Sequence, residues 1–207
     1  MRFRHSAALA ALSCVALVVG SGGAFAEPVG KASAIRTTAL QQEPQAPAAG
    51  ELHLNDAVIR NATLSTKPSS ALEVTFLDGS KLSMGANSTM VVDDYVYSGA
   101  GGAGKQTLRA TRGVFRFVSG TIPKDQVKID TPTVTIGIRG TIFRLLMKDD
   151  QSGALAVENG PNGESYTVIV KSKKTGQVIE LHSGEKVEWD TGGTYGDIGG
   201  GTIEGCE

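Results

Sequence analysis

The glycine-rich segment Gly99-Ala-Gly-Gly-Ala-Gly-Lys-Gln-Thr107 has the residue types and spacing of a phosphate-binding loop. It matches G-x-G-x-x-G, and it departs from G-x-x-x-x-G-K-S/T because Gln106 replaces the serine or threonine. Both motifs bind phosphate with backbone amides and the N-terminus of a following helix. The residues that follow, Leu108 to Phe117, are β-like and contain Gly113. We therefore predict a hairpin loop that binds no nucleotide.

Other residues that could do chemistry are few and scattered. After the expected export cleavage, His53 and His182 remain, and neither belongs to a recognisable serine or cysteine nucleophile motif. Asp93-Asp94 and Asp149-Asp150 could hold calcium in a loop, but neither pair fits the alternating ligands of an EF-hand. The sequence thus predicts no catalytic, cofactor-binding or metal-binding residue, no cofactor and a non-enzymatic protein.

The elements that would position functional groups are β-strands. From Val134 to Ile138 the even positions are apolar, which is the period of a half-buried strand. From Phe143 to Met147 the apolar positions are odd, so the parity changes near Gly140. We predict two β-segments joined by a bend or bulge at Arg139-Gly140, with Pro132 at a strand start or an edge.

Composition places the whole chain in the all-β class. Aromatic residues make up 5%, glycine is abundant, and short Val/Ile runs alternate with turns such as Asp78-Gly79 and Ser183-Gly184. We predict a single domain of short strands forming a sandwich or solenoid-like β-stack, with no major helix after the export segment. The net charge of -1 gives no basic face for nucleic acid, so we expect none as a partner.

Residues 1–26 resemble a secretory signal peptide. Arg2 and Arg4 precede an apolar run, and Ala24-Phe-Ala26 is a cleavage site, so the mature chain should begin at Glu27. A lipoprotein start at Cys14 is the less favoured alternative, because the apolar run continues beyond it. We expect a periplasmic or secreted protein with no stable membrane span.

The mature chain divides into three parts by composition. Residues 27–50 are rich in Ala, Gln and Pro and are predicted to be a flexible linker, and residues 51–190 the β-domain. Residues 191–207 are predicted to be a frayed glycine-rich tail. It contains Cys206, whose thiol is expected to be unpaired and exposed, and intermolecular pairing is the less favoured alternative.

The strongest family resemblance lies in the same region as the parity change. Asp130-Thr-Pro132 followed by Gly137-Ile-Arg-Gly-Thr-Ile-Phe143 resembles the signature of the FecR domain, a periplasmic all-β domain. Leu72 to Ser80, Gly113 to Phe117 and Glu185 to Trp189 resemble its other strands, so that the resemblance covers about residues 55–190. The signature residues are Asp130, Thr131, Pro132, Gly137, Arg139, Gly140, Thr141 and Phe143.

In the sensor-regulators of that family, the resemblance implies a periplasmic domain that reads an outer-membrane transporter, a transmembrane helix and a cytoplasmic domain that holds a sigma factor. We expect neither of the last two parts here. The resemblance implies a protein-binding or signal-sensing module in the bacterial envelope, and a carbohydrate- or envelope-binding structural module is the alternative. The expected partner is an envelope protein or peptide segment, or a second copy, bound along an edge strand.

Overall fold

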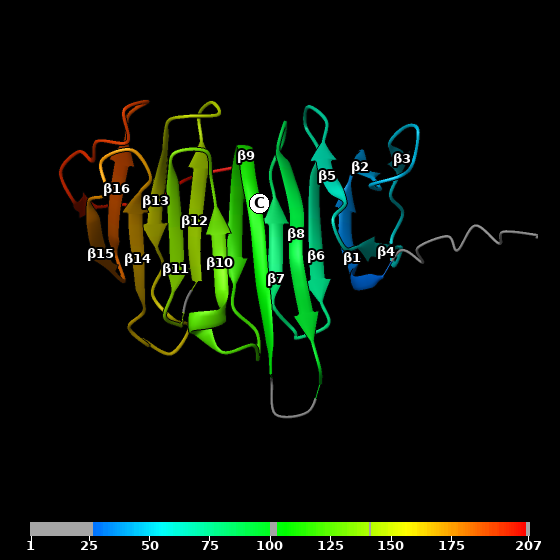
Figure 1. Ribbon diagram of the computed structural model, residues 1–207, viewed down its shortest axis with the longest axis horizontal. Helices are drawn as coiled ribbons and strands as arrows, with labels where there is room; N and C mark the ends of the chain where they lie inside the picture. The colour runs from blue at the N-terminus through cyan, green and yellow to red at the C-terminus, as the bar shows by residue number, and fades with distance from the viewer. Residues whose placement is uncertain (1–26, 100–102, 141, 206–207) are drawn as a thin grey trace, which may run out of the picture.

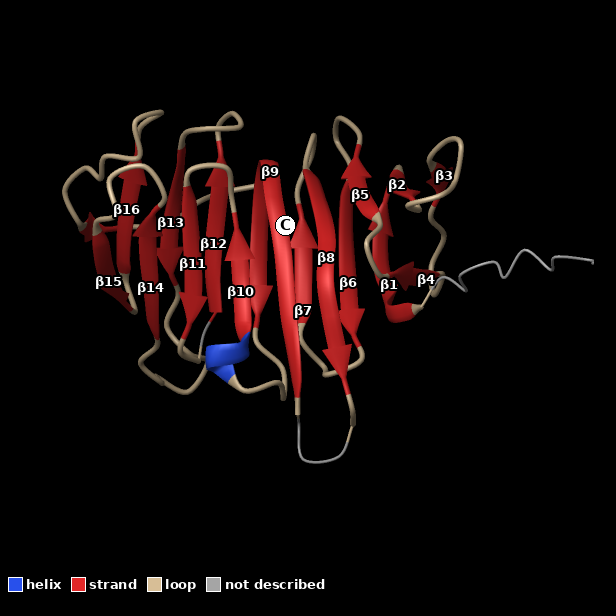
Figure 2. Cartoon of the chain, in the orientation of Figure 1, coloured by secondary structure: helices blue, strands red, loops and turns tan. Residues whose placement is uncertain are grey.

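The described chain is built almost wholly from β-strands that line up along one axis. The computed structural model describes residues 27–99, 103–140 and 142–205. Figure 1 shows the N-terminal strands at one end and the C-terminal strands at the other, and Figure 2 shows how little else there is besides strands. A short 3₁₀ helix, η2 (Lys124–Gln126), is the exception. The all-β prediction is confirmed.

The strands form two sheets that face each other across a common core. Sheet A runs in the order β4, β1, β6, β7, β9, β12, β13, β16, β17. Its strands are β1 (Pro28–Arg36), β4 (Ala57–Ile59), β6 (Ala71–Phe76), β7 (Lys81–Met84), β12 (Ile142–Met147), β13 (Gly153–Val157), β16 (Glu185–Trp189), β17 (Gly199–Gly200) and the second half of β9 (Gly104–Val118).

Sheet B runs in the order β3, β2, β5, β8, β9, β10, β11, β14, β15. Its strands are β2 (Ala39–Gln42), β3 (Gly50–Glu51), β5 (Thr63–Thr66), β8 (Thr89–Tyr97), β10 (Val127–Asp130), β11 (Val134–Ile138), β14 (Thr167–Ser172), β15 (Val178–His182) and the first half of β9.

Strand β9 belongs to both sheets. Its residues 104–112 pair with β8, and 106–109 also pair with β10 in sheet B. Its residues 113–118 pair with β7 and β12 in sheet A. The change of sheet occurs at Gly113, whose φ is +107°. A Cβ there would lie 2.1 Å from Ser88 Oγ and 2.4 Å from Ser88 Cα, so glycine is required both for its backbone conformation and for space.

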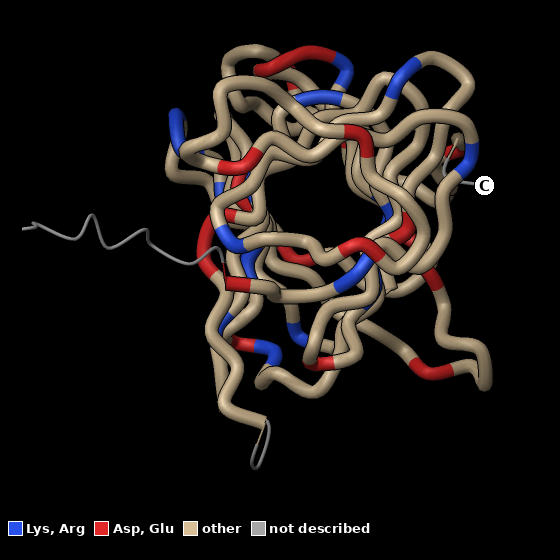
Figure 3. The backbone as a smooth tube through the Cα atoms, turned by 90° about the vertical axis from the view of Figure 1, so that its right-hand side faces the viewer, with Lys and Arg blue, Asp and Glu red and all other residues tan. Residues whose placement is uncertain are grey.

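The core lies between the sheets and follows from strict alternation. In β6 and β12, every second residue is buried and its neighbours face outward. Phe76 stacks on Tyr95 with ring centroids 5.6 Å apart, and Phe117 packs against Phe143 at 5.7 Å. The first pair joins sheet A to sheet B. Figure 3 views the molecule along its long axis and shows the backbone around this core, with acidic and basic residues interspersed along it.

The parity change after Gly140 has a different cause from the one predicted. Strand β11 ends at Ile138 in sheet B, and β12 begins at Ile142 in sheet A. Gly140 has a φ of +88° at this crossing. The two predicted β-segments exist, but they are not two halves of one bulged strand. Parity changes because the chain leaves one sheet for the other while the core stays between them.

The linker predicted at residues 27–50 is wrong for most of its length. Strand β1 pairs with β4 and β6, and β2 pairs with β3 and β5. Val29, Ala32 and Ala39 are buried. Backbone hydrogen bonds and small buried side chains hold this segment, so it needs few large apolar residues. The division of the chain that gives residues 51–190 as the β-domain stays a prediction.

The tail after Trp189 is also more ordered than predicted. It forms β17 beside β16, and Ile203 is 5% exposed. In Figure 1 the tail runs back from the C-terminal end toward the middle of the molecule. The predicted signal peptide and the predicted thiol of Cys206 lie outside the described residues.

Two alanine substitutions should separate the requirements at the sheet crossings. Gly140→Ala meets no atom within 4 Å and should cost about 1 kcal/mol for its positive φ alone. Gly113→Ala adds the clash with Ser88 and should cost about 3 kcal/mol or more. Gly137→Ala is the control, because its nearest contact would be 3.9 Å from the new Cβ. Equal unfolding free energies for the Gly113 and Gly140 variants in denaturant titrations would contradict this explanation.

Candidate functional site

The first part of the signature forms the turn between β10 and β11. Thr131 Oγ1 accepts a hydrogen bond from Val134 N at 2.9 Å and donates to Val134 O at 3.0 Å. Asp130 accepts from Thr135 Oγ1 at 3.0 Å and pairs with Lys173 Nζ at 2.8 Å. Pro132 is exposed just before β11, as predicted for a strand start. These residues hold a turn and bring β14 to it through Lys173.

The second part of the signature lies at the crossing from sheet B to sheet A. Gly137 is within β11, and Arg139 is exposed immediately after that strand. Gly140 takes the positive φ described above, and Phe143 packs in the core on Phe117. Thr141 lies outside the described residues. The structure thus gives the signature a role in the turn and in the sheet crossing.

Another fragment of the resemblance, the Asp78-Gly-Ser80 turn, connects the two sheets. Asp78 Oδ1 accepts hydrogen bonds from Ser80 Oγ at 2.6 Å and from the Tyr95 hydroxyl at 3.2 Å. Asp78 N donates to the same hydroxyl at 2.8 Å. Burial and the neighbouring Asp78 raise the pKa of Tyr95. Because Asp78 follows β6 in sheet A and Tyr95 lies on β8 in sheet B, this contact joins the sheets at one end of their strands.

The glycine-rich motif lies in the hairpin between β8 and β9. Its residues 100–102 lie outside the described part of the chain, and Gly104 onward are strand β9. Ser98 N donates to Ala103 O at 3.1 Å, and Lys105 pairs with Asp94 at 2.9 Å. Gln106, which breaks the phosphate-loop pattern, is fully buried and accepts from Ser80 Oγ at 3.4 Å. The described residues after the motif form a strand and no helix.

The aspartate pairs considered for calcium have other partners. Asp93 pairs with Arg109 at 2.7 Å, and Asp94 with Arg60 at 3.1 Å as well as with Lys105. Asp149 Oδ1 accepts from the backbone amides of Gln151 and Ser152, and these bonds lower the pKa of Asp149. Within residues 27–99, 103–140 and 142–205, no cluster of three or more His, Cys, Asp or Glu could hold a metal ion.

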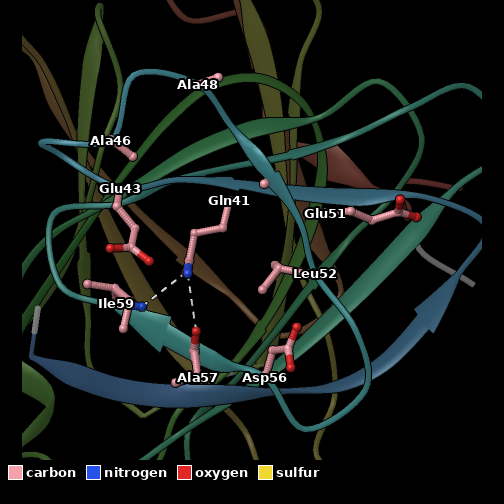
Figure 4. Close-up of a pocket in the computed structure, with 10 residues that line it drawn as sticks. Gln41, Glu43, Ala46, Ala48, Glu51, Leu52, Asp56, Ala57 and Ile59 are labelled. Carbon is pink, nitrogen blue, oxygen red and sulfur yellow. Dashed lines mark hydrogen bonds between the residues drawn. The ribbon is translucent and has the colours of Figure 1, made fainter.

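At the N-terminal end of the sandwich, a buried glutamine covers the edge of sheet A. Gln41 on β2 donates from Nε2 to Ala57 O at 3.2 Å and accepts at Oε1 from Ile59 N at 3.0 Å. Figure 4 shows the two bonds reaching β4. The side-chain amide thus satisfies the same pair of backbone groups that a further strand would satisfy. Gln41 both links sheet B to sheet A and closes this edge.

A cavity of about 440 Å³ lies beside Gln41. Leu52 and Ile59 supply apolar surface, and Glu43, Glu51 and Asp56 supply carboxylates (Figure 4). Asp56 already accepts a hydrogen bond from His53 N at 2.7 Å. The cavity is therefore lined by both carboxylate and apolar side chains.

At the other end, the edge of sheet B is open. Among the described strands, β15 pairs only with β14. Ser172 N donates to Gln177 O at 2.9 Å and Ser183 N to Tyr166 O at 3.1 Å. Because antiparallel pairs alternate along a ladder, the backbone groups of Ile179 and Leu181 face β14 and those of Val178 and Glu180 face away from it. The edge that β15 presents is therefore suited to pairing with another strand.

A charged cluster occupies the outer face of sheet A. Glu158 accepts hydrogen bonds from Arg144 Nε at 2.5 Å and from Arg116 Nη2 at 2.9 Å. Burial by itself would raise the pKa of Glu158, but the hydrogen bonds from Arg116 and Arg144 outweigh it and hold that pKa below its usual range. Arg144 Nη1 also donates to Ile203 O at 3.1 Å, so the cluster touches the C-terminal tail.

Sequence reasoning missed Gln41, Glu158 and the tail as structural residues. Gln41 stands in a segment predicted to be flexible, and its partners are 16 and 18 positions away. Outward-facing apolar residues on β12 and β13 were the one available signal for the tail.

Within the described residues, no helix has the length and apolar character needed to cross a bilayer.

The two facing sheets, with the signature residues in the β10–β11 turn and at the crossing between β11 and β12, define an all-β domain. Comparison with protein families gives the class: the family described as FecR protein matches residues 62–161. This match includes the segment from Asp130 to Phe143 and confirms the resemblance drawn from it. No curated protein matches the chain.

Solved structures similar to this chain include two crystal structures described as a putative anti-sigma factor from Parabacteroides distasonis. Their sequence identities are 17% and 18%, and their TM-scores are 0.49 and 0.48. Each alignment covers 69% of this chain and 60% of the other. The chain therefore spans less than two thirds of the length of these neighbours.

The Glu158 cluster predicts a pH-dependent contribution to stability. Its depressed pKa means that the contribution is fully present above the unfolded value of about 4.3 and is lost as pH falls through the folded pKa. Glu158→Gln should therefore cost about 1–2 kcal/mol at pH 7 and progressively less below about pH 4. Denaturant titrations at several pH values measure this difference.

The matched control is Glu188→Gln on the same face. Glu188 pairs with Lys148 at 2.6 Å, but both side chains are 49% exposed. Such an exposed pair should contribute about 0–1 kcal/mol. A Glu158→Gln penalty that stays constant from pH 7 to pH 3 would contradict the explanation.

Proposed function

We propose that this chain is an exported, non-enzymatic module of the bacterial envelope that binds a protein partner and takes part in signalling or sensing. The FecR domain at residues 62–161 supports the signalling role. The sequence of residues 1–26 supports export. The observation that carries the binding role is the open edge of β15.

Strand addition needs an extended edge with free donors and acceptors, and β15 offers both. Val178 and Glu180 direct their backbone groups away from β14, and Val178 is 55% exposed. His182 N is taken by Glu185 Oε2 at 2.7 Å, so the open part of the edge ends there. A partner strand would gain main-chain hydrogen bonds at Val178 and Glu180 without any catalytic side chain.

The two ends of the sandwich differ, which favours β15 as the binding edge. At the N-terminal end, Gln41 occupies the outward backbone groups of β4. Also at that end, β3 has two residues, against five in β15. Natural sheets protect their edges with short strands and with covering groups. The edge that lacks most of this protection is the better candidate for recognition.

Side-chain charge favours a different protein over a second copy as the partner. Glu180 is exposed at the centre of β15. Antiparallel pairing of two copies over the full strand would place Glu180 opposite Glu180, and like charges at directly opposed positions destabilise a sheet. A partner strand with a basic residue at this position would avoid the repulsion.

The test compares two substitutions of one residue. Glu180→Pro removes the outward amide hydrogen while leaving the ladder to β14 intact, because proline is tolerated where the amide faces solvent. Glu180→Ala removes the same carboxylate and keeps the amide. Envelope proteins from the native host are captured on immobilised residues 27–207 and identified by mass spectrometry.

We expect the proline variant to lose at least tenfold of the specific capture and the alanine variant to keep most of it. Melting curves establish that both variants remain folded. Undiminished capture by a folded proline variant would contradict strand addition. Loss of capture on adding oligosaccharide would instead support the alternative of a carbohydrate-binding structural module.

A further inference from the structure

The outer face of sheet A carries an apolar trough. Ala154 and Ala156 on β13 are both 1% exposed, although they point away from the main core. Leu146 on β12 lies opposite Ala154, and Val114 on β9 lies opposite Leu146. Because alanine is small, the surface is low over β13 and higher over the flanking strands. Contiguous apolar surface is uncommon on the outer face of a sheet, and it usually binds another segment or another molecule.

Residues 199–205 occupy this trough. Ile203 packs on Ala154 and Ala156, with Leu146 and Val114 beside them. Beyond Ile203, Gly205 lies against Val114. The carbonyl oxygen of Gly205 also lies close to Gly85, so that a Cβ added to Gly85 would be 2.2 Å from this oxygen. The tail therefore crosses sheet A from its C-terminal end to β7 and fits closely at both Ile203 and Gly205.

The polar contacts of the tail are few and mostly made by its backbone. Arg144 Nη1 donates to Ile203 O at 3.1 Å, and Gly201 N donates to Gly184 O at 3.3 Å. Strand β17 pairs with β16 over two residues. One aliphatic side chain and a small set of main-chain bonds hold the segment. Any extended peptide with one branched aliphatic residue and small neighbours could make the same contacts.

The chain leading to the trough is attached as far as Gly196 and lightly held beyond it. Tyr195 forms a bridge with Trp189 and packs on the main core, and Gly196 N donates to Glu188 O at 2.9 Å. Beyond this point Ile198 is 45% exposed, and Gly199, Gly200 and Gly201 follow it. Segments with few buried contacts open at a small fraction of the cost of global unfolding. Residues 197–205 can therefore leave the trough while the two sheets and the attached segment up to Gly196 remain folded.

We propose that the trough over Ala154 and Ala156 is a second docking site, which takes an extended partner peptide with one branched aliphatic side chain and small flanking residues. Residues 199–205 occupy it as an internal competitor. The site deepens the proposed partner-binding function and rests on it for the existence of a partner. A partner would have to displace the tail, so binding here is limited by how often the tail detaches.

The experiment uses residues 27–207 and a labelled peptide of residues 197–205 as the probe. Ile203→Asp removes the apolar anchor and should release the tail while leaving the sheets intact. Fluorescence anisotropy should show saturable binding of the peptide to this variant, at least tenfold tighter than to the parent chain. A peptide carrying Ile203→Asp is the control and should bind neither protein.

A second variant tests the position of the site. Ala154→Leu fills the trough in the Ile203→Asp background and should abolish peptide binding without lowering the melting temperature below that of the background. The Glu180→Pro change should leave peptide binding unaltered, so failure at β15 and failure at the trough are distinguishable.

Three results would overturn the proposal. The first is no binding to the folded Ile203→Asp variant, and the second is equal binding to variant and parent. The third is a concentration-dependent dimer of the parent that is lost with Ile203→Asp. That dimer would mean exchange of tails between copies in place of internal competition.

Discussion

The passage of β9 from one sheet to the other constrains the rest of the structure. Because one continuous strand supplies a central member to both sheets, their registers cannot shift independently. The constraint depends on Gly113, where a positive φ and close contact with Ser88 coincide. The Asp78–Tyr95 contact and the Phe76–Tyr95 stack then join the same two sheets on the N-terminal side of the crossing. On the C-terminal side, the hydrogen bond from Trp189 to Thr133 and the crossing at Gly140 play the same part.

The edges of the two sheets differ in whether their outward backbone groups are already hydrogen-bonded, and this difference decides where a partner strand could bind. Gln41 covers one edge with a side-chain amide, and the tail covers part of an outer face with a single isoleucine. Strand β15 keeps open backbone groups. Gln41 and the tail each occupy backbone groups or apolar surface that another chain could otherwise bind. The backbone groups of β15 that remain unoccupied therefore indicate where a partner could bind.

The sequence predicts the strands well, because alternation of apolar residues is a local signal. It places β6, β11, β12 and β16 close to where they lie. It cannot tell a bulge from a change of sheet at Gly140, since both produce the same change of parity. It also misses β1 and β2, because alanine-rich and glutamine-rich strands are held by backbone bonds to partners far along the chain. The trough is hidden for a similar reason: alanines at outward positions gain meaning only once Ile203 is seen to cover them.

The turn that carries the signature also places a spectroscopic reporter. Trp189 is the one tryptophan of the chain, is 3% exposed, and donates from Nε1 to Thr133 Oγ1 at 3.1 Å. Its emission therefore depends on β16 remaining docked against the β10–β11 turn. Tyr95, buried in the N-terminal half, absorbs in a separate environment. Tyr166 and Tyr195 lie in the C-terminal half, so tyrosine absorbance reports on both halves, whereas tryptophan emission reports on the C-terminal half alone. Comparing the two signals shows whether the C-terminal half opens together with the rest of the sandwich or separately from it.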